Sequence, residues 1–211
     1  MNSTVVHESP MVDARLASLG LTRERLANAI LSGDAGASSS TALHPPGNVG
    51  YRRWADTVAG LRRQLLPHGW LQSNALNYCT VYNPATRVAI VVMAGDGNTG
   101  HRAAATRSKY PKGAVTVRRL RLNQQQASMF PDLKSPAEVA EEDCATWVLA
   151  QDADEDGVRA ELSRPRSQDA SGRVVDWYER ILLPPVDPRG PSSANDEGGR
   201  GDDVDFAVTA R

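Results

Sequence analysis

A glycine-rich segment directly follows the most apolar stretch of the chain. Gly95, Gly97 and Gly100 occur in the order Gly-x-Gly-x-x-Gly after residues 87–94, which are nearly all apolar. Glycines in this pattern allow a tight turn in which backbone amides approach a phosphate group. A dinucleotide site would also need a helix directly after the loop and an acid about 20 residues further on, and neither is evident. We therefore expect a loop that binds a phosphate ester, with a plain glycine-rich connection as the alternative.

The residues after Gly97 are rich in cations and contain no acid as far as Pro131. This basic stretch consists of Arg102, Arg107, Lys109, Lys112, Arg118, Arg119 and Arg121. Such a run is typical of a phosphate-binding surface. The next segment, 132–156, holds nine acids and one base, so the two segments carry net charges of +7 and −8. Either the basic stretch binds a polyanion, or the two segments face each other in the folded domain.

Residues 12–33 resemble the helix-turn-helix of bacterial and phage regulators. The matching features are a turn glycine, Gly20, and the apolar residues Leu21, Leu26 and Ile30 that follow it. Leu16 departs from the pattern, because the first helix of that motif usually carries a small residue there. The resemblance implies that the second helix would enter the major groove of DNA. The residues that would face the groove are Arg23, Glu24, Arg25 and Asn28. The alternative is an ordinary helical hairpin.

Residues 126–130 are similar to the short peptide by which bacterial proteins bind the replication sliding clamp. The usual form is Gln-Leu-Ser/Asp-Leu-Phe, and Gln126, Ser128 and Phe130 match it. Met129 stands in place of a leucine, whereas Ala127 departs from the pattern. The resemblance implies that Gln126, Met129 and Phe130 contact the clamp. The alternative is that Met129 and Phe130 fill the core of their own domain.

Residues that could catalyse a reaction or bind a metal are few. The four histidines are scattered, the two cysteines are typical of buried apolar side chains, and no metal-binding spacing occurs. Residues 152–157 begin like a calcium loop, but Ser163 stands where the bidentate glutamate should be. We expect an acidic hairpin turn there. Asp96 and His101, beside the glycine loop, are the best-placed pair for acid–base chemistry. No cofactor is predicted.

Helices and strands of an α+β fold must position these residues. Helices are expected over residues 11–19, 22–32, 51–66, 114–126 and 135–143, and strands over 76–82, 87–94, 146–151, 158–163 and 173–183. These strands predict an antiparallel or mixed sheet of about five strands with packed helices. Residues 87–94 are apolar on both faces, which places them at the centre of the sheet. Segment 114–126 fits a helix or a strand, and its glutamines favour a helix.

The helix over 51–66 has the clearest pattern. Its apolar residues repeat at alternating spacings of three and four, which predicts one face buried in the core. These residues are Tyr51, Trp54, Val58, Leu61 and Leu65.

Composition divides the chain into four parts. Residues 1–33 form the helical hairpin, and residues 34–47, rich in Ser and Pro, form a flexible linker. Residues 48–183 are long enough for one ordinary core. Residues 184–211 are rich in Pro, Gly and Asp and cannot bury enough apolar surface to become ordered.

The overall composition excludes several classes of protein. The chain has 211 residues, with 24 Lys or Arg, 25 Asp or Glu and two Cys, so its formal net charge is −1. A near-neutral chain is not a wholly basic nucleic-acid coat. It lacks an apolar run long enough for a membrane span and a secretory signal at its start. Together with the few cysteines, these features predict a cytoplasmic protein that does not bind membranes.

The helix-turn-helix pattern, the basic stretch and the clamp-like peptide all favour an association with DNA. The leading hypothesis is a non-enzymatic, DNA-associated accessory or regulatory protein of bacterial or mobile-element origin. Its partners would be duplex DNA and the replication sliding clamp. A protein or enzyme that binds a nucleotide or another phosphate ester at Gly95–Gly100 is one alternative. A protein-interaction module with an acidic face is another.

Overall fold

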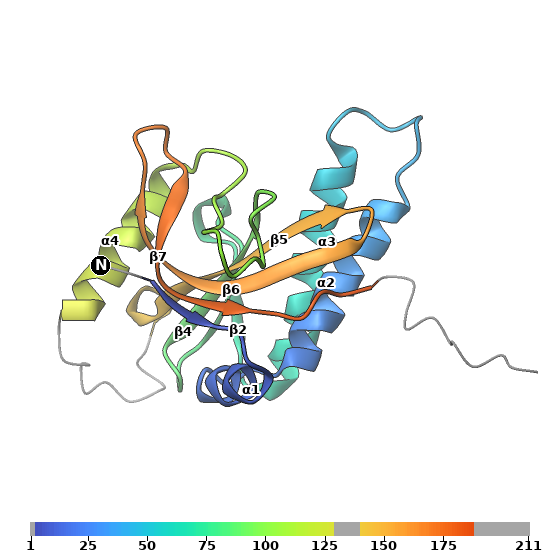
Figure 1. The fold of residues 1–211 in the computed structure, drawn as a ribbon. Helices are drawn as coiled ribbons and strands as arrows, with labels where there is room; N and C mark the ends of the chain where they lie inside the picture. The colour runs from blue at the N-terminus through green and yellow to red at the C-terminus, as the bar shows by residue number, and fades with distance from the viewer. Residues whose placement is uncertain (1–2, 129–139, 188–211) are drawn as a thin grey trace, which may run out of the picture.

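A mixed β-sheet forms the centre of the molecule (Figure 1). The computed structural model describes residues 3–128 and 140–187, without the side chains of residues 126–128. Within these residues the sheet has seven strands in the order β1-β7-β6-β5-β4-β3-β2. The strands are β1 (Thr4–Val6), β2 (Leu71–Ser73), β3 (Thr80–Asn83), β4 (Val88–Ala94), β5 (Ala145–Asp154), β6 (Gly157–Gln168) and β7 (Val174–Leu182). The predicted α+β class with a mixed sheet is confirmed, with two more strands than expected.

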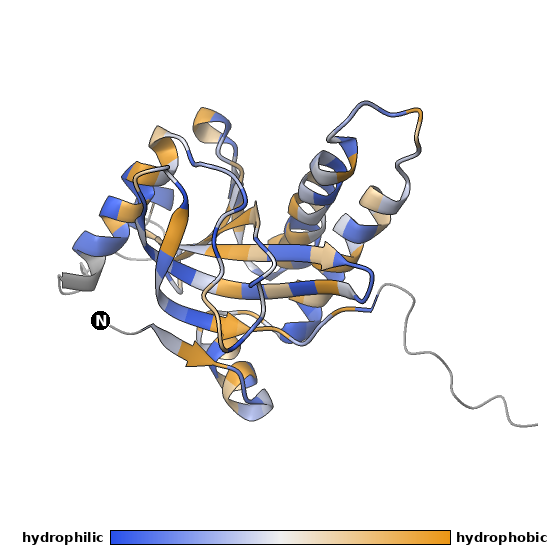
Figure 2. Cartoon of the chain, turned by 45° about the horizontal axis from the view of Figure 1, so that its top comes forward, coloured by the Kyte–Doolittle hydropathy of each residue, from blue (hydrophilic) through white to orange (hydrophobic). Residues whose placement is uncertain are grey.

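Helices and a long loop cover the two faces of this sheet (Figure 1). The helices are α1 (Ser9–Ser18), α2 (Arg23–Ser38), α3 (Asn48–Leu65) and α4 (Ala114–Ser128), with the short 3-10 helices η1 (Leu66–His68), η2 (Ala75–Asn77) and η4 (Glu141–Asp143). Helices α1, α2 and α3 pack with Ile90 and Leu149 in the larger core cluster. Val91, Val148 and Trp177 form a smaller cluster, and the Trp177 indole donates a hydrogen bond to the Thr106 carbonyl in the loop at 95–113. Figure 2 shows hydrophobic and hydrophilic residues alternating along both the strands and the helices, as expected for elements with one buried face.

The position of β4 explains where a pocket can form. β4 pairs antiparallel with β3 and parallel with β5, and all its residues except Ala94 are buried. The prediction that 87–94 is a central strand is therefore confirmed. β4 ends at Ala94, opposite Gln151, whereas β5 and β6 continue as a hairpin to Asp154 and Gly157. The hairpin thus projects past the carboxyl end of β4 and leaves one side of β5 without a neighbouring strand there.

Helix α2 is longer than its sequence predicts. The prediction that it ends before Gly33 is wrong, because the helix continues to Ser38 through part of the expected linker. Gly33 is not a helix cap but a packing residue against α3. A Cβ atom at Gly33 would lie 1.9 Å from Thr57 Oγ1 and 2.6 Å from the Arg53 carbonyl oxygen. The absence of a side chain therefore lets the two helices approach closely.

Substitution of Gly33 tests this packing. Alanine normally stabilises a helix interior by about 1 kcal/mol relative to glycine, but overpacking costs about 1–3 kcal/mol. We expect Gly33→Ala to lower the free energy of unfolding in urea titrations. Gly50 in α3 has nothing within 4 Å of an added Cβ, so Gly50→Ala should be neutral or stabilising. Equal effects of the two substitutions would contradict the close packing.

Several other predicted elements are confirmed. Residues 114–128 form a helix, α4, and Asp156-Gly157 lies at the turn between β5 and β6. The predicted strand at 76–82 begins late, because residues 75–77 form η2, with Leu76 and Asn77 at positive φ values of 55° and 57°. Most of the helix predicted at 135–143 lies outside the described residues.

The predicted tail is described only at its start. Val186 forms two backbone hydrogen bonds with Val158, and residues from 188 onward lie outside the description. No helix within residues 3–128 and 140–187 is both long and apolar enough to cross a bilayer.

Candidate functional site

A pocket of about 550 Å³ lies at the carboxyl ends of β4 and β5. Its walls are the first turns of α3, the loop residues 109–112 and the ends of the two strands. In α/β sheets, ligands commonly bind beyond the carboxyl ends of parallel strands, near a change in strand connection. β4 and β5 are such a parallel pair, and β4 adjoins an antiparallel neighbour on its other side. The position of this pocket is therefore typical of a ligand site.

Two lysines give the pocket its charge. Lys109 is exposed and Lys112 is half-buried, and neither ammonium group has a carboxylate partner among the described residues. Burial lowers the pKa of the Lys112 ammonium below the ordinary lysine value. A half-buried cation without a counter-charge costs solvation energy, and a bound anion would offset that cost.

The other charged residues of the pocket are already paired. The Arg53 guanidinium lies 2.5 Å from the carboxylate of Asp34 on α2. Asp152 lies 3.5 Å from the Arg159 guanidinium. The amide of Gln151, which also lines the pocket, donates a hydrogen bond of 3.0 Å to the Thr57 hydroxyl. Because these charges are compensated, the two lysines leave the pocket with a net positive charge.

The amino end of α3 adds to this positive potential. Gly47 precedes the helix with a φ of 86°, and no side chain caps the first amides. Gly47, Val49 and Gly50 all line the pocket. Free amides and the helix dipole at an amino end favour a nearby anion. The amino end of α3 therefore adds to the positive potential of the two lysines, which remain the main feature of the site.

The glycine-rich loop has a structural role that sequence reasoning did not reveal. The Gly95 amide donates to the Gln151 carbonyl, and the Gly100 amide donates to Glu161 Oε2 at 3.0 Å. Two of the three predicted phosphate-binding amides are therefore already used, while Gly97 has open space beside its Cα atom. The carboxylate of Asp96 accepts the amides of Asn98 and Arg107. An anion site is consequently better placed farther along the basic stretch.

A buried ion pair holds this loop on the sheet. Arg180 Nη2 lies 2.6 Å from Glu161 Oε2, and the two side chains are 2% and 0% exposed. Arg180 also donates to the His101 carbonyl at 3.1 Å, and Ser163 donates to Glu161 Oε1. Asp96 and the His101 carbonyl therefore both accept hydrogen bonds that hold the loop in place, whereas the His101 side chain is exposed.

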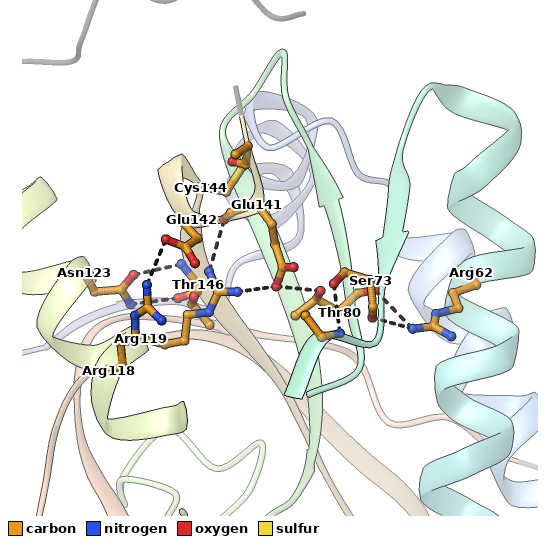
Figure 3. Close-up of polar contacts among 12 residues, drawn as sticks. Arg62, Ser73, Thr80, Arg118, Arg119, Asn123, Glu141, Glu142, Cys144 and Thr146 are labelled. Atoms are coloured by element: carbon orange, nitrogen blue, oxygen red, sulfur yellow. Dashed lines mark hydrogen bonds and ion pairs between the residues drawn. The ribbon is translucent and has the colours of Figure 1, made fainter. Parts of the chain in front are cut away.

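The basic stretch and the acidic segment meet at α4 (Figure 3). Arg118 lies 2.9 Å from Glu142. Arg119 pairs with Glu141 and also donates to the Glu141 carbonyl at 3.2 Å. Thr80 donates to the same Glu141 carboxylate at 2.8 Å. Arg118 and Arg119, two of the predicted nucleic-acid-binding residues, therefore form ion pairs with acidic residues of the same chain.

Buried groups near this cluster are poor nucleophiles. Burial raises the pKa of the Tyr78 hydroxyl to about 12, and the Arg119 guanidinium lies 5.9 Å from the centre of its ring. Burial likewise raises the pKa of the Cys144 thiol to about 11. Both groups stay protonated near neutral pH. Within the described part of the chain, no three His, Cys, Asp or Glu residues are grouped to hold a metal ion.

The residues of the helix-turn-helix resemblance lie apart from the pocket. Gly20 forms the turn at a φ of 77°, as the resemblance implies. Arg23 pairs with Asp13 and donates to the Ser9 carbonyl in α1. Arg25 and Asn28 are half-buried.

The remaining predicted residues are also dispersed. Arg102 is exposed and lines a smaller pocket of about 240 Å³ together with Arg23, whereas Lys109 and Lys112 line the larger one. Arg107 is exposed as well. The side chain of Gln126, and Met129 and Phe130 entirely, lie outside the described residues.

Sequence reasoning missed the aromatic residues of the pocket. Tyr51, predicted to face the core, is 62% exposed, and Trp54 is half-buried. The rest of the predicted stripe (Val58, Leu61 and Leu65) is buried. The difference arises because the first turns of α3 lie beside the pocket at the end of β4 and do not lie over the middle of the sheet. Tyr110, next to Lys109 in the sequence, is 61% exposed and was not singled out.

No match to this chain is found among protein-family models, curated proteins or solved structures, so a function has to be inferred from the site itself.

Proposed function

We propose that this protein binds a small phosphate ester in the pocket between α3 and residues 109–112. The observation that carries the proposal is the half-buried Lys112, which lines the pocket and has no counter-charge among the described residues. Lys109 and the uncapped amino end of α3 supply further positive potential. A phosphate carries a negative charge and several acceptor oxygens, which suits this combination of donors.

The dimensions of the pocket support a small organic ligand. Its volume of about 550 Å³ lies within the range of about 300–1,000 Å³ that is usual for small-molecule sites. An inorganic phosphate would leave most of that space unfilled. The proposed ligand is therefore a phosphate ester with an organic part.

Removal of the Lys112 charge tests the proposal. Lys112→Met keeps the apolar stem of the side chain and removes its ammonium group. A hydrogen bond to a charged group contributes about 1.5–3 kcal/mol, so we expect an affinity loss of about ten- to a hundredfold. Thermal unfolding with a series of esters from ribose 5-phosphate to AMP would measure it, because a ligand of the folded state raises the melting temperature.

Arg121→Met is the matched control for this experiment. Arg121 belongs to the same basic stretch but is exposed on α4 and does not line the pocket. Its replacement should change affinity less than twofold, which is about 0.4 kcal/mol. A series in which no ester raises the melting temperature, or in which both variants behave alike, would refute the proposal.

Duplex DNA is a second candidate ligand, on a surface that shares Lys109 with the pocket. The observation that favours it is the exposure of Arg102, Arg107 and Lys109 in one loop. Binding through these cations should weaken steeply with salt. A gel-shift titration with salt would test this salt dependence. If a variant with alanine at Arg102, Arg107 and Lys109 bound DNA as well as the native chain, this surface would be excluded as the DNA site. The sliding-clamp interaction stays a prediction from sequence.

A further inference from the structure

Three aromatic side chains share the pocket with the two lysines. Tyr51 and Trp54 come from the first turns of α3, and Tyr110 comes from the opposite loop. The two tyrosines are 62% and 61% exposed. Large exposed aromatic side chains beside one pocket are characteristic of a binding surface. The phosphate alone does not account for them.

The arrangement of these rings suits a planar group. The Tyr51 and Trp54 ring centroids are 6.0 Å apart with an angle of 46° between the planes, so the two rings form one angled wall. Tyr110 lies between Lys109 and Lys112 in the sequence. Because Tyr110 lines the same pocket as these lysines, a phosphate held by them leaves the rest of the ligand within reach of the tyrosine ring. Every nucleobase has a planar face that can stack on such rings, whichever base it is.

The pocket also offers a hydrogen-bond acceptor to the rest of the ligand. Asp152 is the acid that lines the described walls of the pocket, and it is paired with Arg159 at 3.5 Å. Arg159 compensates the charge of this carboxylate, but its oxygens can still accept hydrogen bonds, so a ribose hydroxyl or a base amine can donate to it. The pocket thus combines a cationic part, an aromatic part and an acceptor.

We propose that the phosphate ester is a nucleotide, with its phosphate on Lys109 and Lys112 and its base packed among Tyr51, Trp54 and Tyr110. This inference rests on the anion-binding function proposed above and specifies its ligand class. Stacking supplies affinity for the base, and the lysines supply affinity for the phosphate. Neither a sugar phosphate nor a nucleoside would use both sets of contacts.

Calorimetric titration with AMP, ribose 5-phosphate and adenosine tests the inference on the full chain. We expect AMP to bind about tenfold or more tightly than either fragment. Tyr110→Leu and Tyr51→Leu should each weaken AMP binding about five- to tenfold and leave ribose 5-phosphate within about twofold. Because both side chains are largely exposed, these variants should fold normally. Lys112→Met should weaken both phosphates.

Tyr178→Leu is the control variant, because Tyr178 lies on β7 under the guanidinium groups of Arg164 and Arg166 and outside the pocket. It should bind AMP like the native chain. Equal binding of AMP and ribose 5-phosphate, with no effect of Tyr110→Leu or Tyr51→Leu, would overturn the nucleotide inference and leave anion binding intact. Failure of every phosphate ester to bind would overturn both.

Discussion

Replacement of Glu161 by alanine should lower the free energy of unfolding by about 3–5 kcal/mol, because it leaves a buried arginine without its counter-charge. Arg180 and Glu161 are 2% and 0% exposed, so bulk water does not solvate the guanidinium that is left behind. The substitution also removes the acceptor of the Gly100 amide. Urea unfolding would measure the loss. Hydrogen exchange at Gly100 should accelerate in parallel.

Two further variants separate charge from packing at this pair. Asp13→Ala removes an ion pair whose acid is 58% exposed, and such surface pairs contribute about 0–1 kcal/mol. The double variant Glu161→Leu, Arg180→Met replaces both charges by apolar groups and should recover part of the lost stability. If Glu161→Ala cost no more than Asp13→Ala, the buried pair would not hold the loop as described.

Asn123→Leu is expected to cost about 3 kcal/mol or more, because it leaves buried backbone groups unpaired at about 1–3 kcal/mol each. The Asn123 amide donates to the Thr146 and Pro165 carbonyls at 2.9 and 3.2 Å. Its oxygen accepts the Thr146 amide at 2.8 Å. These contacts replace strand pairing, since the ladder between β5 and β6 begins only at Val148 and Ser163. Pro165 itself has no amide to donate.

Thermal and urea unfolding of Asn123→Leu and Arg121→Leu would measure this effect. Both residues lie on α4, but Arg121 is exposed whereas Asn123 is completely buried. Arg121→Leu should change stability by about 0.5 kcal/mol or less. A similar small loss for Asn123→Leu would show that the backbone groups of Thr146 and Pro165 find other partners.

Local patterns in the sequence predict the centre of this fold well. The apolar residues of β4 favour a buried strand and Asp156-Gly157 favours a hairpin turn, and tertiary contacts reinforce both local preferences. The edge strands β1 and β2 have three residues each, which is too short for an alternating pattern to be distinguished from a loop. The sequence cannot show why residue 33 is a glycine. The reason is the close approach of Thr57, which lies 24 positions away in the chain.

The candidate site was predictable only in part. Lys109 and Lys112 belong to the basic stretch that the sequence singles out, but nothing local distinguishes them from Arg118 and Arg119. The distinction comes from tertiary contacts, since Arg119 finds Glu141 across 22 positions and Lys112 finds no acid among the described residues. The exposed tyrosines beside the lysines likewise become apparent only once α3 and the loop lie on opposite sides of the pocket.

An NMR titration of the isotopically labelled chain with AMP tests the central claim most directly, because it locates the bound ligand. The pocket proposal predicts saturable shifts in the amide signals of Gly50, Lys109 and Lys112, with no comparable change at Arg25 in α2. In Lys112→Met, the signals of Gly50 and Lys109 should need about ten- to a hundredfold more AMP to reach the same shifts. If no pocket amide shifted saturably, or if the largest shifts lay in α2, the phosphate ester would not bind where the lysines and tyrosines converge.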